Sequence, residues 1–327
     1  MLGGFLAAAA AVAAGAGELK TFKDWTVGCD NGRACHGVGQ YSAENMDVIS
    51  VSISRGADAT DAPKIWFRLQ DSPAIDLAAD SRRLGVSFVN DEENQTVAAG
   101  SVPKVIDAFR TAGKIELVGA DGKIIGKLSS QGAAAAMLYM DEQQRRTDTV
   151  TALIRKGAKP ASAVPPPPAL PVVRRAAASG GPLRKLTAAQ VRQIQQDNAE
   201  CTDDDVSDKV EYARIDAHTT LAIVNAICAS GAYNFYGIPV LLRDNGKREL
   251  ARFEGRKEDD LTMNMSWKPK ERLLDSYFKG RGMGDCGGGS DWAWDGARFR
   301  LVRSRMMDEC LGATEWITTF RARVVDR

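Results

Sequence analysis

The chain has 327 residues, with 43 Lys and Arg against 42 Asp and Glu, and a formal net charge of +1. A balance this close to neutrality excludes the strong general attraction to nucleic acid or anionic membrane that a basic surface gives. A chain of this length is too long for one small core, so we expect two domains.

The first residues, MLGGFLAAAAAVAAGAG, predict a secretory signal peptide over 1–16. An apolar run ends in Ala14-Gly15-Ala16, a pattern typical of a signal cleavage site. No Lys or Arg precedes the run, so a wrong start or a buried N-terminal helix is the alternative. We expect a periplasmic or secreted protein. No transmembrane segment is expected after signal removal, because no later stretch reaches about 18 apolar residues.

The stretch WTVGCDNGRACHG places Cys29 and Cys35 around Asn31-Gly32, the preferred centre of a tight hairpin turn. The two cysteines then lie opposite each other on one face, which favours a disulfide. Zinc needs four ligands, usually with closer cysteine spacing, and a thioredoxin-like pair needs C-x-x-C. Free thiols and a metal site remain the alternatives. His36 is then expected beside the staple, as a surface residue.

The N-terminal domain, residues 17–158, is expected to be mostly β with two helices. Apolar–polar alternation predicts its strands, Asp121-Gly122 a hairpin, Ser101 the start of a helix and Gly113 its end. The expected strands cover 47–55, 64–69 and 84–89, followed by the hairpin over 115–128, and the second helix covers 131–146.

Residues 159–182 read KPASAVPPPPALPVVRRAAASGGP and predict an interdomain linker. Four consecutive prolines favour polyproline II, and the flanking Ala, Ser and Gly cannot build a core.

The C-terminal domain, residues 183–327, opens with a helix, because Thr187 and Gln190 have the spacing of a capping box. The strands that follow are read in VEYARID, TLAIVNAI, IPVLLRD, RELARFE and LTMNMSW, with hairpin turns at 244–247 and 295–298. The fold class is therefore mainly β with a few helices, a β-rich α+β chain. We expect two disulfide-stapled, β-sandwich- or barrel-like domains on a Pro-rich linker.

The other four cysteines lie in the C-terminal domain. Four cysteines permit three pairings. Pairing Cys201 with Cys228 and Cys286 with Cys310 keeps each bridge inside one contiguous stretch. An even cysteine number suits an exported protein.

An acidic stretch follows the predicted helix, with five acids in the nine residues from Glu200 to Asp208. We expect a solvated loop. The weak alternative is calcium held by Asp203, Asp205 and Asp208, although the spacing departs from an EF-hand loop. A basic partner is a further alternative. No other metal and no cofactor are expected. A His-rich metal site is excluded, because His36 and His218 are the two histidines of the chain.

Aromatic residues gather in two places. Tyr233 and Tyr236 lie among small residues, and Trp292 and Trp294 stand two apart on a predicted strand. We favour the interpretation that these rings fill the β core. Exposed rings would stack on a sugar or peptide, so these four residues remain the possible ligand-binding residues.

The chain resembles an exported bacterial family, the domain of unknown function 1176 family. The residues that carry the likeness are FKDWTVGCDNGRAC (22–35), LTAAQVRQIQQDNAEC (186–201), GAYN (231–234), CGGGSDWAWDGARFRL (286–301) and the closing MMDEC…W (306–316). The resemblance implies an envelope protein without established activity. From Trp25 to Cys29 and again over 123–146, the N-terminal half more distantly resembles the invasion-associated locus B family, which implies a secreted β-sandwich-type protein.

No catalytic motif stands in a supporting context, so we assign no catalytic residues. We expect a non-catalytic envelope-accessory or binding protein, with an unknown envelope protein or glycan as partner and no nucleic acid. One alternative is a cell-wall or glycan hydrolase that uses Asp285, Asp291 and Asp295 near the two tryptophans. A second alternative is an inhibitor or a stress-related ligand binder.

Overall fold

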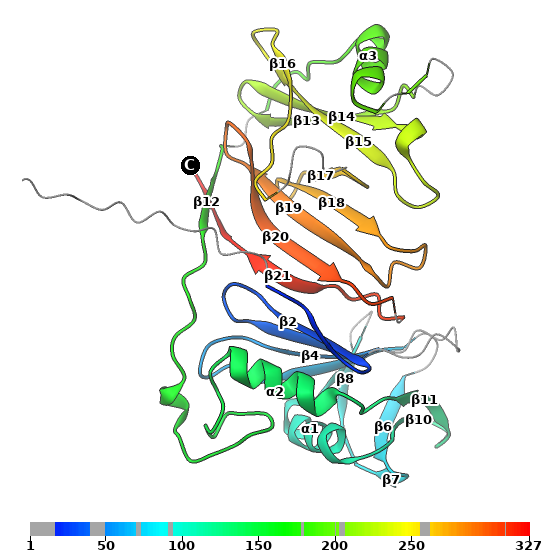
Figure 1. The fold of residues 1–327 in the computed structure, drawn as a ribbon, viewed down its shortest axis with the longest axis vertical. Helices are drawn as coiled ribbons and strands as arrows, with labels where there is room; N and C mark the ends of the chain where they lie inside the picture. Colours follow the sequence, from blue (N-terminus) through cyan, green and yellow to red (C-terminus); the bar gives the residue numbers. More distant parts are fainter. Residues whose placement is uncertain are drawn as a thin grey trace, which may run out of the picture.

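The computed structural model describes residues 17–39, 50–69, 73–90, 94–177, 180–199, 201–202, 207–255, 262–310 and 312–327. The predicted signal peptide lies outside these residues. The described chain is mainly β, with three α-helices and several antiparallel sheets arranged in layers (Figure 1). We call residues 17–158 the N-terminal half and residues 183–327 the C-terminal half.

A seven-stranded sheet, the large sheet, organises the N-terminal half. Its side chains alternate between two faces, so Val27, Ile53 and Phe67 enter one hydrophobic core while the residues between them face the other way. In spatial order its strands are β1 (Lys20–Phe22), β2 (Trp25–Cys29), β3 (Cys35–Gly39), β4 (Ser50–Arg55), β5 (Lys64–Arg68), β9 (Gln95–Val97) and β8 (Phe88–Asn90).

Two helices and a small sheet close the core of this half. The helices are α1 (Val102–Thr111), preceded by the 3₁₀ turn Ala99–Ser101, and α2 (Ala133–Gln143). The ring of Phe109 in α1 stands edge-on to Trp25, with ring centroids 5.3 Å apart. The strands of the small sheet, in spatial order, are β11 (Ile124–Leu128), β10 (Ile115–Gly119), β6 (Ala74–Ala79) and β7 (Arg82–Arg83).

Two further sheets form the C-terminal half, and they share a core that contains Trp292, Trp294 and Phe299. The outer sheet consists of β13 (Val210–Asp216), β14 (Thr219–Ala226), β15 (Tyr236–Arg243) and β16 (Arg248–Leu250), and α3 (Ala188–Ala199) packs on its other face. The inner sheet consists of β17 (Ser266–Lys268), β18 (Leu273–Lys279), β19 (Gly287–Trp294), β20 (Phe299–Met307) and β21 (Ile317–Arg321).

The inner sheet faces the N-terminal half (Figure 1). Val38 of β3 shares a small buried cluster with Met307 and Ile317, and the N–H of Gly17 donates to the carbonyl of Thr319 at 2.8 Å. The two halves are therefore in direct contact.

The Pro-rich segment runs along one side of the molecule, between the region of α2 and the C-terminal half (Figure 1). It contains the 3₁₀ turn Ala161–Ala163 and ends in a strand, β12 (Val172–Arg175), which pairs in parallel with β22 (Arg323–Asp326). The extended linker of the sequence prediction thus contributes a β-strand, because the closing residues of the chain offer a strand edge to it.

Several predicted elements differ in extent. Only the end of the stretch 84–89 is a strand, and β16 and β17 are shorter than their apolar patterns suggest. Ser101 precedes α1 but makes no cap, because its hydroxyl accepts a hydrogen bond from the Ser87 N–H. The barrel-like alternative is wrong for the described strands, since each sheet runs from one edge strand to another without closing.

Three disulfides are present, Cys29–Cys35, Cys201–Cys228 and Cys286–Cys310, which are the pairs expected from the sequence. They are consistent with an oxidising compartment. Within the part of the chain that the structure describes, no helix has the length and apolar composition needed to cross a membrane.

Candidate functional site

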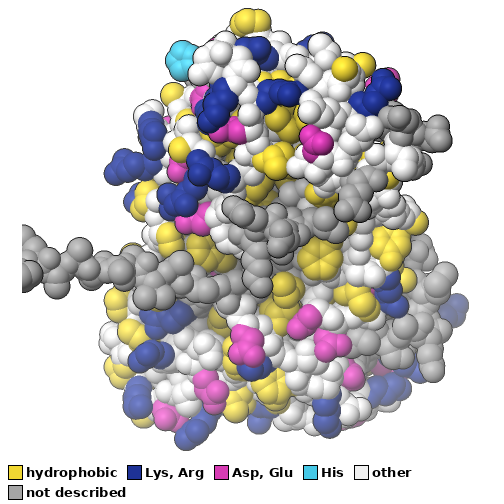
Figure 2. All heavy atoms as spheres, turned by 45° about the horizontal axis from the view of Figure 1, so that its top comes forward, with side chains coloured by type: hydrophobic (Ala, Val, Ile, Leu, Met, Phe, Trp, Pro, Cys, Tyr) yellow, Lys and Arg dark blue, Asp and Glu magenta, His cyan; other side chains and the backbone are white. Residues whose placement is uncertain are grey.

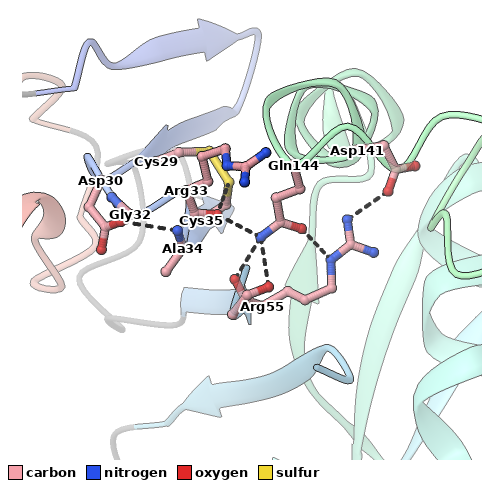
Figure 3. The surroundings of a disulfide bond; sticks show 10 residues. Cys29, Asp30, Gly32, Arg33, Ala34, Cys35, Arg55, Asp141 and Gln144 are labelled. Atoms are coloured by element: carbon pink, nitrogen blue, oxygen red, sulfur yellow. Dashed lines mark hydrogen bonds and ion pairs between the residues drawn. A yellow bond between two sulfur atoms is a disulfide. The ribbon is translucent and has the colours of Figure 1, made fainter. Parts of the chain in front are cut away.

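The Cys29–Cys35 disulfide closes the turn between β2 and β3 (Figure 3). The carboxylate of Asp30 is folded into the turn, where its Oδ1 accepts hydrogen bonds from the N–H groups of Gly32 at 2.8 Å and Ala34 at 3.0 Å. The staple and this carboxylate together hold residues 29–35 in one conformation. We call residues 29–35 the stapled turn.

The stapled turn binds β21 of the other half through side chains. Asn31 donates from Nδ2 to the carbonyl of Arg321 at 2.9 Å and accepts the Arg321 N–H at 2.7 Å. The second oxygen of Asp30 forms an ion pair with Nε of Arg321, and the Asp30 side chain is only 2% exposed. The turn therefore fixes both the backbone and the guanidinium group of Arg321.

A buried polar network contacts the stapled turn through Gln144, at the C-terminal end of α2 (Figure 3). Gln144 donates from Nε2 to the carbonyls of Arg33 at 3.0 Å and Arg55 at 2.9 Å, and its Oε1 accepts from Nε of Arg55. Arg55 also pairs with Asp141 at 2.7 Å, and both side chains are fully buried. Burial lowers the pKa of Arg55 to about 10, against the opposing charge of Asp141.

A second contact between the halves is centred on Glu315, in the loop before β21. Its Oε1 accepts a hydrogen bond from Nε1 of Trp66 at 2.8 Å, and its Oε2 accepts one from the Ser52 hydroxyl. His36 lies beside the same carboxylate, with Nε2 3.9 Å from Oε2. Burial lowers the pKa of His36 to about 4, against the opposing charge of Glu315, so the imidazole is neutral at pH 7. Glu315 is thus held on the polar face of the large sheet.

A pocket of about 1020 Å³ lies on the face of the inner sheet that is turned away from the outer sheet. Leu170 of the Pro-rich segment and Thr314 of the loop before β21 form part of its wall. Six basic side chains face three acidic ones in this pocket: Lys268, Lys279, Arg303, Arg305, Arg321 and Arg323 against Glu271, Asp275 and Asp291. The pocket is therefore cationic, although the whole chain is almost neutral.

Two carboxyl groups lie side by side at the floor of the pocket. Asp275 of β18 and Asp291 of β19 are paired residues of neighbouring strands, and Arg305 donates from Nη2 to Asp275 at 3.0 Å. Burial, and then the hydrogen bond and the charge of Asp291, raise the pKa of Asp275 to about 6, against the opposing charges of Arg305 and Lys268. Asp275 therefore changes its charge near neutral pH.

Two arginines of the pocket, Arg303 of β20 and Arg321 of β21, are also cross-strand partners. Like charges placed directly opposite destabilise a sheet. Each guanidinium group is held by an aspartate at Nε, Arg303 by Asp291 and Arg321 by Asp30. This arrangement leaves the Nη groups of both arginines for other partners.

The family model described as "Protein of unknown function (DUF1176)" matches residues 19–323. The chain belongs to this family. The chain is also 32% identical over 115 residues to the uncharacterized protein YpfG of Escherichia coli strain K12, a match that covers 31% of this chain and 33% of YpfG. The chain thus matches only about a third of YpfG. No solved structure matches it.

In this DUF1176 protein the two tryptophans named as possible ligand-binding residues are buried, as the favoured core interpretation expects. Trp292 is 3% exposed and Trp294 1% exposed, in the core between the inner and outer sheets. Trp294 donates from its indole N–H to Asp216. They lie away from the pocket because alternation along β19 turns them to the opposite face from Asp291. Tyr233 is 37% exposed, and Tyr236 packs in part against the core under α3.

The three aspartates of the hydrolase alternative are separated in the structure. Asp285 is buried in an ion pair with Arg281 and accepts the Gly312 N–H at 2.7 Å. Asp295 accepts hydrogen bonds from backbone N–H groups in the turn between β19 and β20. Of the three, only Asp291 lines the pocket.

The calcium candidates Asp203 and Asp205 lie outside the described residues, and Asp208 is exposed. Among the residues that the structure does describe, no group of three His, Cys, Asp or Glu side chains is placed to hold a metal ion.

Most of the residues that line the pocket were not predicted from the sequence. Asp275 lies in LLDSYFK and Arg303 and Arg305 in FRLVRSRMM, two stretches that are β18 and β20 in the structure. The sequence does contain one indication of the pocket: charged residues two apart on a half-buried strand must lie on the same face of the sheet. Glu315 left no such signal, because its partners are more than 200 residues away.

Proposed function

We propose that this chain is an exported, non-catalytic binding protein of the bacterial envelope, periplasmic or secreted, and that its ligand occupies the pocket of the inner sheet. The three disulfides support a location outside the reducing cytoplasm. We infer that residues 17–158 and 183–327 are two folding units, the second a β-sandwich, held as one body by the stapled turn and Glu315.

The observation that carries this proposal is the way distant parts of the chain converge on one pocket. The inner sheet supplies the floor, the Pro-rich segment supplies Leu170, and the stapled turn orients Arg321 through Asp30. Arg33 of the stapled turn also donates to the carbonyl of Pro165 at 3.3 Å, which anchors the Pro-rich segment beside the pocket. A preformed concave site with a few convergent polar groups is typical of ligand binding.

The carboxyl pair favours binding over hydrolysis. Glycosidases separate their two carboxyl groups by about 5–9.5 Å, so that the sugar and often a water fit between them. Asp275 and Asp291 are instead direct cross-strand neighbours, and arginines hold both of them. A glycan hydrolase therefore stays the second candidate, and nothing in the pocket favours an inhibitor or a stress-related binder. The distant likeness to the invasion-associated locus B family adds no argument for a role in a host.

Native mass spectrometry of the protein purified from its own exported fraction tests the proposal. We expect a reproducible non-covalent adduct in the wild type. The adduct should be lost when Ala322→Trp fills the pocket and kept in Arg248→Gln, an exposed change on β16. Turnover of peptidoglycan or another envelope glycan, abolished by Asp291→Asn and without a retained adduct, would favour the hydrolase instead.

A further inference from the structure

We propose that Arg303 and Arg321 form a subsite for a phosphate oxyanion, and that the pocket binds a phosphorylated saccharide. The inference rests on the proposed function, since it names the class of ligand for the same pocket.

Aspartates hold the guanidinium groups of Arg303 and Arg321 in place. Arg303 and Arg321 are cross-strand partners, and the aspartates that neutralise them contact only Nε. Among the described residues, the Nη groups of both arginines have no hydrogen-bond partner. A carboxylate at Nε fixes the orientation of each guanidinium group. The Nη groups are then placed to donate parallel N–H bonds to an oxyanion.

The pocket also contains basic side chains whose charge is not neutralised by an ion pair within the described residues. Lys268, Lys279 and Arg323 line the same pocket, and none of them pairs with a carboxylate in the described part of the chain. A carboxylate ligand brings one charge and two oxygens. A phosphate monoester brings between −1.5 and −2 at pH 7 and three acceptor oxygens. The surplus of cations therefore favours the phosphate monoester.

Two aromatic side chains in the pocket indicate what the rest of the ligand is. Tyr277 and Trp316 stand together on the pocket wall, with ring centroids 6.3 Å apart and ring planes at 61°. The indole N–H of Trp316 donates to the carbonyl of Gly284 at 3.0 Å, which fixes that ring. Rings at this angle form a corner and not a parallel slot. A puckered sugar fits such a corner, whereas a flat nucleobase prefers rings that stack on its faces.

The volume agrees with this class of ligand. Small-molecule sites commonly measure about 300–1,000 Å³, and this pocket lies at the upper end of that range. A single phosphate ion would leave most of it empty, so we expect a disaccharide or a similar body attached to the phosphate.

Isothermal titration calorimetry on the exported, disulfide-bonded chain tests the inference with trehalose 6-phosphate and glucosamine 6-phosphate. The matched probes are trehalose, glucosamine, glucuronate, AMP and inorganic phosphate. We expect at least one phosphosugar to bind more tightly than its unphosphorylated partner and AMP by about 30-fold or more. Each lost charged hydrogen bond should cost about 10-fold or more in affinity, so Arg303→Gln and Arg321→Gln should weaken binding by that factor. Arg303→Lys should bind the phosphosugar about as weakly as Arg303→Gln, because the ammonium group of lysine lacks the planar guanidinium geometry.

Two controls separate binding from folding and one ligand source from another. Arg248→Gln removes an exposed arginine on β16 and should leave the affinity unchanged, and the Tm of each variant reports its folding. Because Arg321 also joins the two halves, Arg323→Gln serves as a second variant, since the Arg323 side chain makes no hydrogen bond or ion pair with another residue that the structure describes. Phosphatidylcholine vesicles with and without a phosphorylated glycolipid show whether the sugar phosphate is soluble or lipid-borne.

Distinct results would overturn this inference and the proposed function. Equal binding of trehalose and its phosphate, lost on Trp316→Ala, would reject the phosphate subsite and keep the pocket as a binding site. Equal binding of AMP or inorganic phosphate would reject the saccharide. No binding by any probe would reject the phosphosugar class, while the adduct measurement would still decide the proposed function.

Discussion

Replacing Asp275 with Asn should stabilise the protein at neutral pH and not in acid. The pKa of Asp275 rises from 3.8 to about 6 through burial and the neighbouring Asp291. A raised pKa means that the folded state binds the proton more tightly than the unfolded state. The stability that this proton contributes is complete below about pH 4 and is lost as the pH rises through 6. Asn is neutral at every pH and resembles the protonated carboxyl group.

The size of the effect follows from the shift. Two units at about 1.4 kcal/mol each give nearly 3 kcal/mol, and solvent reaching the pocket reduces this to about 2 kcal/mol. Urea unfolding at pH 4 and pH 7.5 measures the difference between Asp275→Asn and wild type, which cancels the titration of every other group. The difference should favour the variant by about 2 kcal/mol more at pH 7.5. Asp121→Asn, on an exposed turn where Lys123 lowers the carboxyl pKa, should shift the difference in the opposite sense. An equal difference at both pH values for Asp275→Asn would contradict the raised pKa of Asp275.

Three further predictions concern the contacts that hold the halves and the stapled turn. Asp141→Ala should cost about 3–5 kcal/mol in urea unfolding, because it leaves the charge of Arg55 buried and unpaired; a cost below 1 kcal/mol would contradict the buried pair. Replacing Cys29 and Cys35 with Ser should cost about 2 kcal/mol by loop entropy, and calorimetry should also show weaker phosphosugar binding; unchanged affinity would mean that the staple does not position Arg321. For His36, whose pKa falls from 6.5 to about 4, stability is complete above pH 6.5 and falls by about 2–3 kcal/mol towards pH 4. The stability of His36→Gln, measured with the wild type by urea unfolding across that pH range, should lack this fall. If both proteins lost stability equally as the pH fell, the lowered pKa of His36 would be contradicted.

Local structure followed from local sequence where turn and cap chemistry decide it. Asn31-Gly32 lies in the turn between paired cysteines, and Thr187 and Gln190 form the reciprocal capping box, with hydrogen bonds of 3.0 and 3.3 Å. The hairpin at Asp121-Gly122 also forms. In each case the deciding atoms lie within a few residues of each other, so a short stretch of sequence contains the whole interaction.

The candidate site could not be read in the same way, because its contacts join residues far apart in the chain. Trp66 and Glu315 are 249 residues apart, and Asp30 and Arg321 are 291 apart. The three aspartates near Trp292 were candidates for a hydrolase site because they lie within a few residues of each other in the sequence. Strand alternation then turned Asp291 towards the pocket and the tryptophans into the core. Adjacency in sequence is a poor guide to a shared site on a β-sheet.

Anomalous diffraction from a crystal of the disulfide-bonded protein soaked with tungstate, a heavy tetrahedral oxyanion, tests the proposed oxyanion site most directly. We predict a strong tungsten peak in the pocket, within about 4 Å of the guanidinium groups of both Arg303 and Arg321. The same peak should be absent from crystals of Arg303→Gln. A wild-type crystal with tungsten peaks only at other basic surfaces, and none in the pocket, would contradict the assignment of this pocket as an oxyanion site.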